Sequence, residues 1–186
     1  MTPIILFVSI GLLLSSVFAR NPCGTPEWRY SPHNGKCYKL FDEQVDWTSG
    51  EFTCDFYGAH LVSIHNAADN QFVAELAKQA GTVWIGAAMF GGSRSYTYGD
   101  KSNFDFENWE GGFRPAYVRR NKCIHLDGQS GKWLQRCCTI DLTAFICQKD
   151  PIELPGEIIE EISPFDKAAI EKNTIDFRRR KFIRRL

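Results

Sequence analysis

Seven cysteines follow an apolar leader, and these two features restrict the folds open to this chain more than any other property. Residues 1–19 are typical of a signal peptide, because a long apolar run precedes Val17-Phe18-Ala19, which supplies small residues for cleavage before Arg20. A membrane anchor is the alternative, but the run is short for a membrane span and has no positive flank. We therefore predict a secreted, extracellular protein in an oxidising compartment, where disulfides form.

The cysteine spacing indicates disulfide bonds rather than a metal site. The sequence contains no Cys-x-x-Cys pair or Cys/His cluster of the kind that holds zinc. Cys137 and Cys138 are adjacent and cannot easily bridge each other, and an odd count leaves at least one thiol without a partner in the chain. Spacing alone leaves about fifteen ways of connecting even six cysteines, so the pairing remains open at this point.

The rest of the chain divides into a domain over residues 20–150 and a tail over 151–186. The domain contains all the cysteines, and 44% of the whole chain is apolar, so a sizeable core can be buried. The 22 basic and 22 acidic residues balance each other, which argues against a nucleic-acid partner. The tail is acidic first and then basic, and it ends with six cationic side chains: Arg178, Arg179, Arg180, Lys181, Arg184 and Arg185.

Helix signals come first in the domain and strand signals follow, which predicts an α+β fold. Asp46 is a candidate N-cap for a helix over 47–56, and Asn66, with Asp69 three residues later, begins a second helix that Gly81 ends. A long stretch over 89–122 is rich in Gly, Asn and aromatic residues, and loops of this length are usually functional. Short strands are expected at 83–85, 96–98, 123–126, 132–134 and 144–148.

The order of several motifs resembles one known family over residues 23–149. Cys37-Tyr38-Lys39 is similar to the second strand of an opening hairpin, and Trp84-Ile85-Gly86 matches a core Trp-Ile-Gly motif. Asn108-Trp109 fits a long loop, and Phe145-Ile146-Cys147 fits a closing strand. Each motif is weak alone, but together they resemble the C-type lectin-like domain in its long form.

This resemblance implies a disulfide-stapled fold in which two helices pack on antiparallel sheets beside a long loop. It also implies that Cys138 rather than Cys137 bonds to Cys123, because the family places that cysteine five residues after a tryptophan, here Trp133. An unpaired Cys137 predicts a disulfide-linked homodimer or a cap by a small thiol. The full set of implied disulfides is Cys23–Cys37, Cys54–Cys147 and Cys123–Cys138.

Sugar-binding members of this family hold calcium with a defined set of side-chain oxygens, and this chain departs from that set. The resemblance implies Glu-Pro-Asn or Gln-Pro-Asp on the long loop, a Glu shortly before Cys123, and Asn-Asp after Trp133. Calcium requires about six to eight oxygen ligands, and arginine instead brings a fixed positive charge. We therefore predict no calcium cofactor, since the matching positions hold Arg114, Ala116, Asn121, Leu134 and Gln135.

A basic and aromatic stretch remains on the loop as the candidate ligand-binding site. It is either a patch for anionic groups, such as sulfated glycans, phosphate headgroups or an acidic protein, or a solvated surface strand. The other loop aromatics, from Tyr96 to Phe113, either stack on sugars or pack inside the loop, and packing is favoured. The candidate residues are Arg114, Tyr117, Arg119, Arg120 and Lys122.

We predict that the protein is not an enzyme. Its four histidines show no metal-ligand spacing, and Ser63 lies near His65 in sequence only, whereas catalytic triads are spatial. The first hypothesis is an extracellular recognition protein that binds a carbohydrate or protein ligand without calcium. The second is a membrane-active innate-defence effector whose basic tail binds anionic membranes, and a solvated tail competes with it. The four histidines are His33, His60, His65 and His125.

Overall fold

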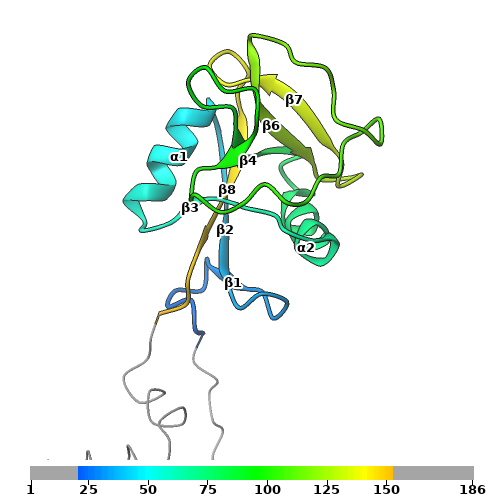
Figure 1. Ribbon diagram of the computed structural model, residues 1–186. Coiled ribbons are helices and arrows are strands. Elements are labelled where there is room, and N and C mark those ends of the chain that lie inside the picture. The colour runs from blue at the N-terminus through cyan, green and yellow to red at the C-terminus, as the bar shows by residue number, and fades with distance from the viewer. Residues whose placement is uncertain (1–20, 153–186) are drawn as a thin grey trace, which may run out of the picture.

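Figure 1 shows the computed structural model of the chain, which describes residues 21–152. Residues 1–20 and 153–186 lie outside this description, and so do the signal peptide and the six cationic tail residues from Arg178 to Arg185. The predicted division into leader, domain and tail therefore stays a prediction. No helix in the described part of the chain is long and apolar enough to cross a membrane.

Two helices and eight strands make up the described residues, and the predicted α+β class is confirmed. Both helices begin where their caps predict, and the expected strands are found at each predicted place, most of them longer than expected. In chain order the elements are β1 Arg29–Tyr30, β2 Cys37–Val45, α1 Trp47–Phe56, β3 His60–Leu61, α2 Ala67–Ala77, β4 Thr82–Ala88, β5 Thr97–Tyr98, β6 Asn121–Asp127, β7 Trp133–Cys137 and β8 Thr143–Lys149.

The strands form one mixed sheet instead of the purely antiparallel sheets that were expected. Its main order is β1-β2-β8-β4-β6-β7, with β3 added beside β8 and β5 beside β4. The exception to antiparallel pairing lies at the centre, where Val83 and Trp84 of β4 pair in parallel with Ala144 and Phe145 of β8. A parallel pair requires a long crossover connection, and here the long loop with β5, β6 and β7 supplies it.

Local capping chemistry fixes where each helix begins. The Asp46 carboxylate accepts a hydrogen bond from the Ser49 amide at 3.1 Å, and Asn66 accepts one from the Asp69 amide at 2.9 Å. Helix α2 ends at Ala77, four residues before the predicted stop. The turn after it closes when the Gly81 amide, in the left-handed region at φ +84°, bonds to the Ala77 carbonyl at 2.9 Å.

The sheet separates two hydrophobic clusters. In Figure 1, α1 and α2 lie on opposite sides of β2 and β8. One cluster lies against α2 and the long loop, and the other lies against α1. Successive residues of β8 alternate between them, because side chains along a strand point to opposite faces: Ile146 joins the first cluster, and Phe145 and Cys147 join the second.

Three disulfides tie these layers together, and they join the same cysteines that the resemblance implies. Cys23–Cys37 anchors the N-terminal segment to β2, and Cys123–Cys138 links β6 to the residue after β7. Cys54–Cys147 connects α1 to β8 across a sequence separation of 93 residues. Closing a loop of that length stabilises the fold by roughly 4 to 5 kcal/mol in the chain-entropy model. Cys137 has a free thiol.

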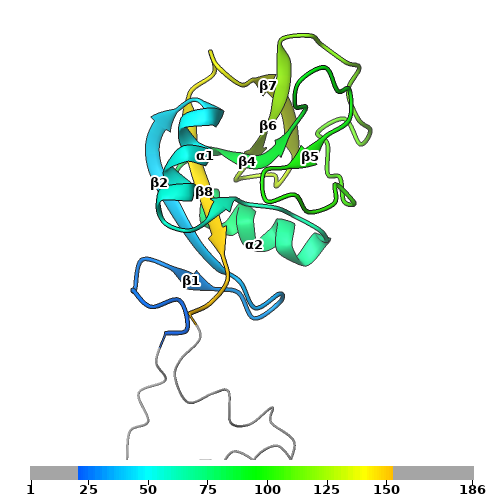
Figure 2. The same ribbon diagram turned by 60° about the vertical axis from the view of Figure 1, so that its left-hand side comes forward.

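The two ends of the described chain lie side by side beneath β1. The amide of Ile152 donates a hydrogen bond to the carbonyl of Pro22 at 2.8 Å. In Figures 1 and 2 the long loop lies at the other end of the molecule. The loop and its surface are thus remote from both ends of the domain.

Candidate functional site

The candidate site is built on the long loop between β4 and β6. Its aromatic side chains mostly point inward, as the packing interpretation predicted: Tyr96, Tyr98 and Trp109 are buried, while Phe104 and Phe106 pack against the same cluster. Three aromatic residues of the loop are exceptions: Phe113 is 75% exposed, Phe90 46% and Tyr117 40%. The loop has no long strands, but it keeps a defined shape because its own aromatic rings are buried beneath it.

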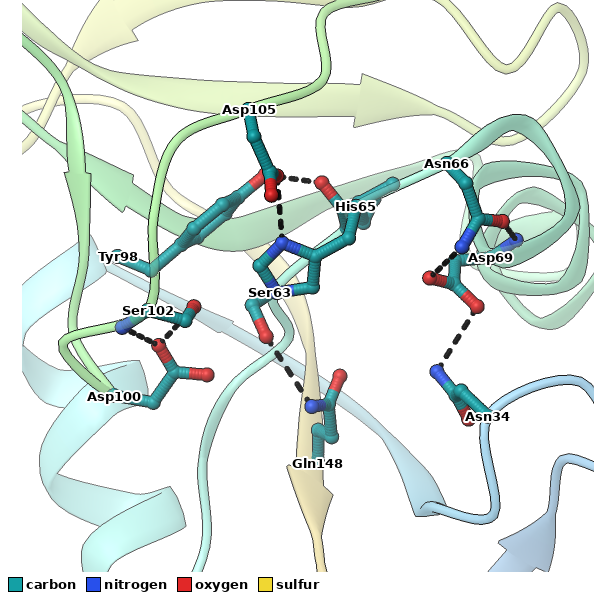
Figure 3. Close-up of polar contacts among 11 residues, drawn as sticks. Asn34, Ser63, His65, Asn66, Asp69, Tyr98, Asp100, Ser102, Asp105 and Gln148 are labelled. Carbon is teal, nitrogen blue, oxygen red and sulfur yellow. Dashed lines mark hydrogen bonds and ion pairs between the residues drawn. The ribbon is translucent and has the colours of Figure 1, made fainter.

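Polar contacts fasten this loop to the segment between β3 and α2, as Figure 3 shows. The hydroxyl of Tyr98 donates to the carbonyl of Ile64 at 2.8 Å. His65 Nδ1 lies 2.7 Å from an oxygen of Asp105, and this hydrogen bond lowers the pKa of the Asp105 carboxyl. The loop is therefore held at both of these positions by the extended segment that follows β3.

Ser63 and His65 also lie in this region, but their partners are structural. The side-chain amide of Gln148 donates to the Ser63 hydroxyl at 3.2 Å, while His65 is paired with Asp105. Within residues 21–152 no hydrogen bond joins Ser63 to His65. Their closeness in sequence therefore produces two separate contacts rather than a nucleophile and its base.

Arg114 and Glu107 form the central ion pair of the loop. The Arg114 Nε donates to Glu107 Oε2 at 2.9 Å, and the Trp109 indole donates to the same oxygen. A terminal guanidinium nitrogen of Arg114 donates to the other oxygen, Oε1. The bond from Arg114 lowers the pKa of Glu107, and the same bond raises the pKa of Arg114. The guanidinium lies over the Phe104 and Tyr96 rings at 5.5 and 5.9 Å.

Gln135 of β7 joins the same network from the sheet. Its amide donates to the Tyr96 hydroxyl at 2.8 Å, and burial raises the pKa of Tyr96. The resemblance places calcium ligands at the positions of Gln135 and Arg114. Here the Gln135 amide is engaged with Tyr96, and Arg114 is a cation. In the described residues no group of three or more His, Cys, Asp or Glu side chains could hold a metal ion. This donor set does not fit calcium.

A cavity of about 440 Å³ opens beside this network, between the loop and β7. Its walls are mainly apolar, and four of the residues that line it have polar side chains: Glu110, Asn121, Gln135 and Arg136. A concave apolar surface with a few polar groups is the usual form of a ligand site. The residues that line it are Trp109, Glu110, Gly111, Phe113, Pro115, Ala116, Val118, Asn121, Trp133, Leu134, Gln135 and Arg136.

The five predicted ligand-binding residues divide into two groups around this cavity. Arg119 and Arg120 form the tip of a turn closed by the Asn121 amide and the Val118 carbonyl, which both belong to residues of the cavity wall. Both arginines are exposed, and no ion pair engages them within the described residues.

The other three predicted residues already have partners inside the protein. Arg114 is bound to Glu107, and Lys122 donates to the Gly91 carbonyl at 2.8 Å. The Tyr117 ring is covered by the guanidinium of Arg94, which lies 5.0 Å from the ring centre. These three therefore shape the loop, and Arg119 and Arg120 are the cations free to meet a ligand.

Sequence reasoning missed two cations of this surface, Arg94 and Arg136. Arg136 of β7 is among the residues that line the cavity, and no local pattern indicates this, because it depends on how the loop folds against the strand. No sequence signal connects Arg94 with Tyr117, since the two are far apart in the chain and meet only when the loop folds.

Comparisons with known proteins agree with this architecture. Residues 43–149 match the family described as Lectin C-type domain. A C-type lectin mannose-binding isoform of Oxyuranus scutellatus is 34% identical, with 77% of this chain and 96% of that protein covered. C-type lectin BfL-2 of Bungarus fasciatus is 33% identical, with 76% and 96% covered.

A solved structure shares the fold at lower sequence identity. The calcium-independent type II antifreeze protein superimposes with a TM-score of 0.62 over 69% of this chain and 95% of its own, at 22% identity. That likeness shows the fold alone, whereas the family match covers more than half of the chain. The chain belongs to the C-type lectin domain family.

Proposed function

We propose that this protein is a secreted, non-enzymatic recognition protein that binds a carbohydrate or protein ligand without calcium. The observation that carries the proposal is the cavity between the long loop and β7, with Arg136 in its wall and Arg119 and Arg120 at its edge. Apolar walls provide contact area for a sugar ring or an apolar side chain, and the cations select a ligand with anionic groups.

Calcium independence is supported by the way the loop is held. In a calcium-dependent site the ion neutralises loop carboxylates and brings them together. Here the Arg114 guanidinium neutralises Glu107, and Gln135 fixes Tyr96, so the loop is organised by side chains that are always present. A guanidinium remains charged at every physiological pH, so the loop needs no ion to keep its shape.

Secretion is supported by the leader over residues 1–19 and by three disulfides, which persist in oxidising compartments. The curated relatives include a protein named as a mannose-binding isoform. We extend to this chain only the binding of a ligand, and neither mannose nor calcium, because the candidate site carries cations at positions where the resemblance implies oxygen donors.

The test is an array of neutral, sulfated and sialylated glycans together with acidic peptides, probed with the full chain in millimolar calcium and in EGTA. We expect retention on anionic ligands that is equal in both buffers. The double variant Arg119→Ala with Arg120→Ala should weaken retention by on the order of tenfold, since each charge-assisted bond contributes about 1 kcal/mol or more.

The matched control is Lys36→Ala with Lys78→Ala, which removes a half-buried and an exposed cation whose partners, Asp150 and Glu75, do not line the cavity. It should bind as the wild type does. Retention that requires calcium, or that falls equally in both double variants, would contradict the proposal.

A further inference from the structure

A second exposed aromatic surface lies on α1, on the other side of the sheet from α2. Phe52 and Phe56 are four residues apart on the helix and point the same way, with 75% and 81% of their surfaces exposed. Phe56 contacts Tyr57 at the end of the helix, with ring centres 5.4 Å apart. We call Phe52, Phe56 and Tyr57 the α1 aromatic face. Apolar rings gathered in this way usually mark a contact surface.

The α1 aromatic face continues to the place where the described chain ends. Tyr57 lies 6.5 Å from Trp28, and Lys149, only three residues before Ile152, lies 4.1 Å from the centre of the Trp28 ring. The Ile152 amide is bonded to Pro22, next to the Cys23 that packs in the same cluster as Trp28. The chain therefore leaves the domain beside one end of this aromatic surface.

Charged side chains of both signs lie around this surface. Two cations cover its rings, Lys149 over Trp28 and Lys39 over Tyr57. Two acids, Asp55 of α1 and Glu43 of β2, are exposed. No lysine or arginine occurs between residues 40 and 77, so no cation of that stretch neutralises the acidic part.

The remaining 34 residues of the chain carry their acids and their cations in two separate groups. Glu153, Glu157, Glu160 and Glu161 come first, and the six cations between Arg178 and Arg185 come last. Apolar residues occupy the positions between and among them: Phe165, Ile170, Ile175, Phe177, Phe182 and Ile183. We propose that this segment of the same chain covers the α1 aromatic face, with its acids near Lys149 and Lys39 and its cations near Asp55 and Glu43.

The chain is long enough to follow this path. Helix α1 has 10 residues and is therefore about 15 Å long. The 12 residues from 153 to 164 span up to about 40 Å when extended. The apolar residues from 165 onward can thus reach every part of the helix surface. Tethering a partner to the same chain also raises its effective concentration, so a weak contact suffices.

The test is photo-cross-linking in the full chain, with p-benzoylphenylalanine incorporated at position 56 in place of Phe56. We expect adducts at the mass of a single chain, formed with peptides from residues 165–185. The matched control places the same probe at position 113, because Phe113 is also an exposed phenylalanine, at 75% against 81%. Tail adducts should be several times more abundant at position 56.

A charge variant tests the proposed pairing of the tail cations with Asp55. Asp55→Lys should lower the yield of tail adducts at position 56 about two- to fivefold, as expected for exposed ion pairs. Glu75→Lys on α2, which reverses an exposed charge away from this face, should leave the yield unchanged. Adducts at twice the chain mass would assign the face to a second copy and overturn the proposal, as would equal tail adducts at positions 56 and 113 or an unchanged yield in Asp55→Lys.

Discussion

Phe52 on α1 and Phe113 on the long loop are equally exposed, at 75% each, but lie in opposite electrostatic surroundings. Phe113 shares its loop with Arg114, Arg119 and Arg120, whereas Phe52 lies in a stretch that contains no lysine or arginine. Exposed apolar surface alone therefore identifies two contact faces but not their partners. The neighbouring charges decide which partner each face accepts.

The two faces also differ in how they are supported. Helix α1 rests on its cap, on buried Trp47 and on the Cys54–Cys147 disulfide. The loop has no disulfide between residues 89 and 122, and it depends on buried rings and on the Arg114–Glu107 pair. We expect the loop face to be sensitive to side-chain deletion and the α1 face to tolerate it, and four experiments probe this contrast.

The largest effect is expected from Trp109→Ala. Trp109 is 3% exposed and packs against Tyr96 and Trp133, so its removal leaves a cavity under the loop. The free energy of unfolding should fall by about 3 to 5 kcal/mol in urea denaturation. The counterpart Phe52→Ala should change it by less than about 0.5 kcal/mol. Equal losses would remove the contrast between the faces.

A second experiment uses pH to separate the two sides of the sheet. His125 on β6 lies against the Trp84 ring of the α1-side cluster, with ring centres 4.0 Å apart. Burial, with the charge of Arg136 nearby and only partly offset by Asp141, lowers the pKa of His125 to about 4 from 6.5. His125 therefore takes up a proton below pH 6.5 in the unfolded chain, but only below about pH 4 in the folded chain.

Stability should consequently fall as pH decreases from 6.5 to 4, by up to roughly 3 kcal/mol, and should be fully present above 6.5. His125→Asn should remove this slope between pH 6.5 and about 5, above the range in which carboxyl groups such as Asp105 and Glu107 contribute, and His33→Asn, at an exposed histidine, should keep it. Urea denaturation at several pH values provides the measurement. A slope that survives in His125→Asn would assign the acid sensitivity to another group.

A third experiment concerns Cys137, the last residue of β7, which belongs to neither face. A hydrogen bond from the Thr139 backbone lowers the pKa of this free thiol, and nearby Ile140 and Leu142 are exposed. We expect a disulfide-linked dimer on a non-reducing gel that disappears in Cys137→Ser. Unfolding free energy should change by less than about 0.5 kcal/mol. A dimer that persists in Cys137→Ser but not in Cys138→Ser would reverse the cysteine assignment.

The smallest effect is expected from calcium. If Arg114 and Gln135 organise the loop, the melting temperature should move by less than about 1 °C between millimolar calcium and EGTA. A saturating shift of several degrees would show that the loop face holds a calcium ion. The described contrast in charge between the loop face and the α1 face would then be wrong.

The sequence predicts the elements of this fold well because their signals are local. Asp46 and Asn66 cap helices that begin at the next residue, and the periodicity of Trp47, Gly50 and Cys54 identifies the buried side of α1. The parallel pairing of β4 with β8 was not predicted, because it depends on how distant strands meet rather than on any short pattern.

The candidate site was predicted less completely. The departures from the family's calcium ligands were visible at Arg114 and Gln135, but the partners that engage them, Glu107 and Tyr96, come from other parts of the loop. The cavity likewise requires β7 and the loop together. Sequence identifies which residues are unusual, and only the folded loop decides which of them remain free for a ligand.

The hydrogen bond between Ile152 and Pro22 has a consequence for how such a domain is carried by larger assemblies. Because the chain enters and leaves the domain at adjacent points, the domain can be inserted into a loop of another protein without distorting that loop or the domain itself. A copy mounted in this way would project its cavity outward, away from the support. An ordered row of copies would then present all of their cavities in one plane, where avidity for a repetitive surface is greatest.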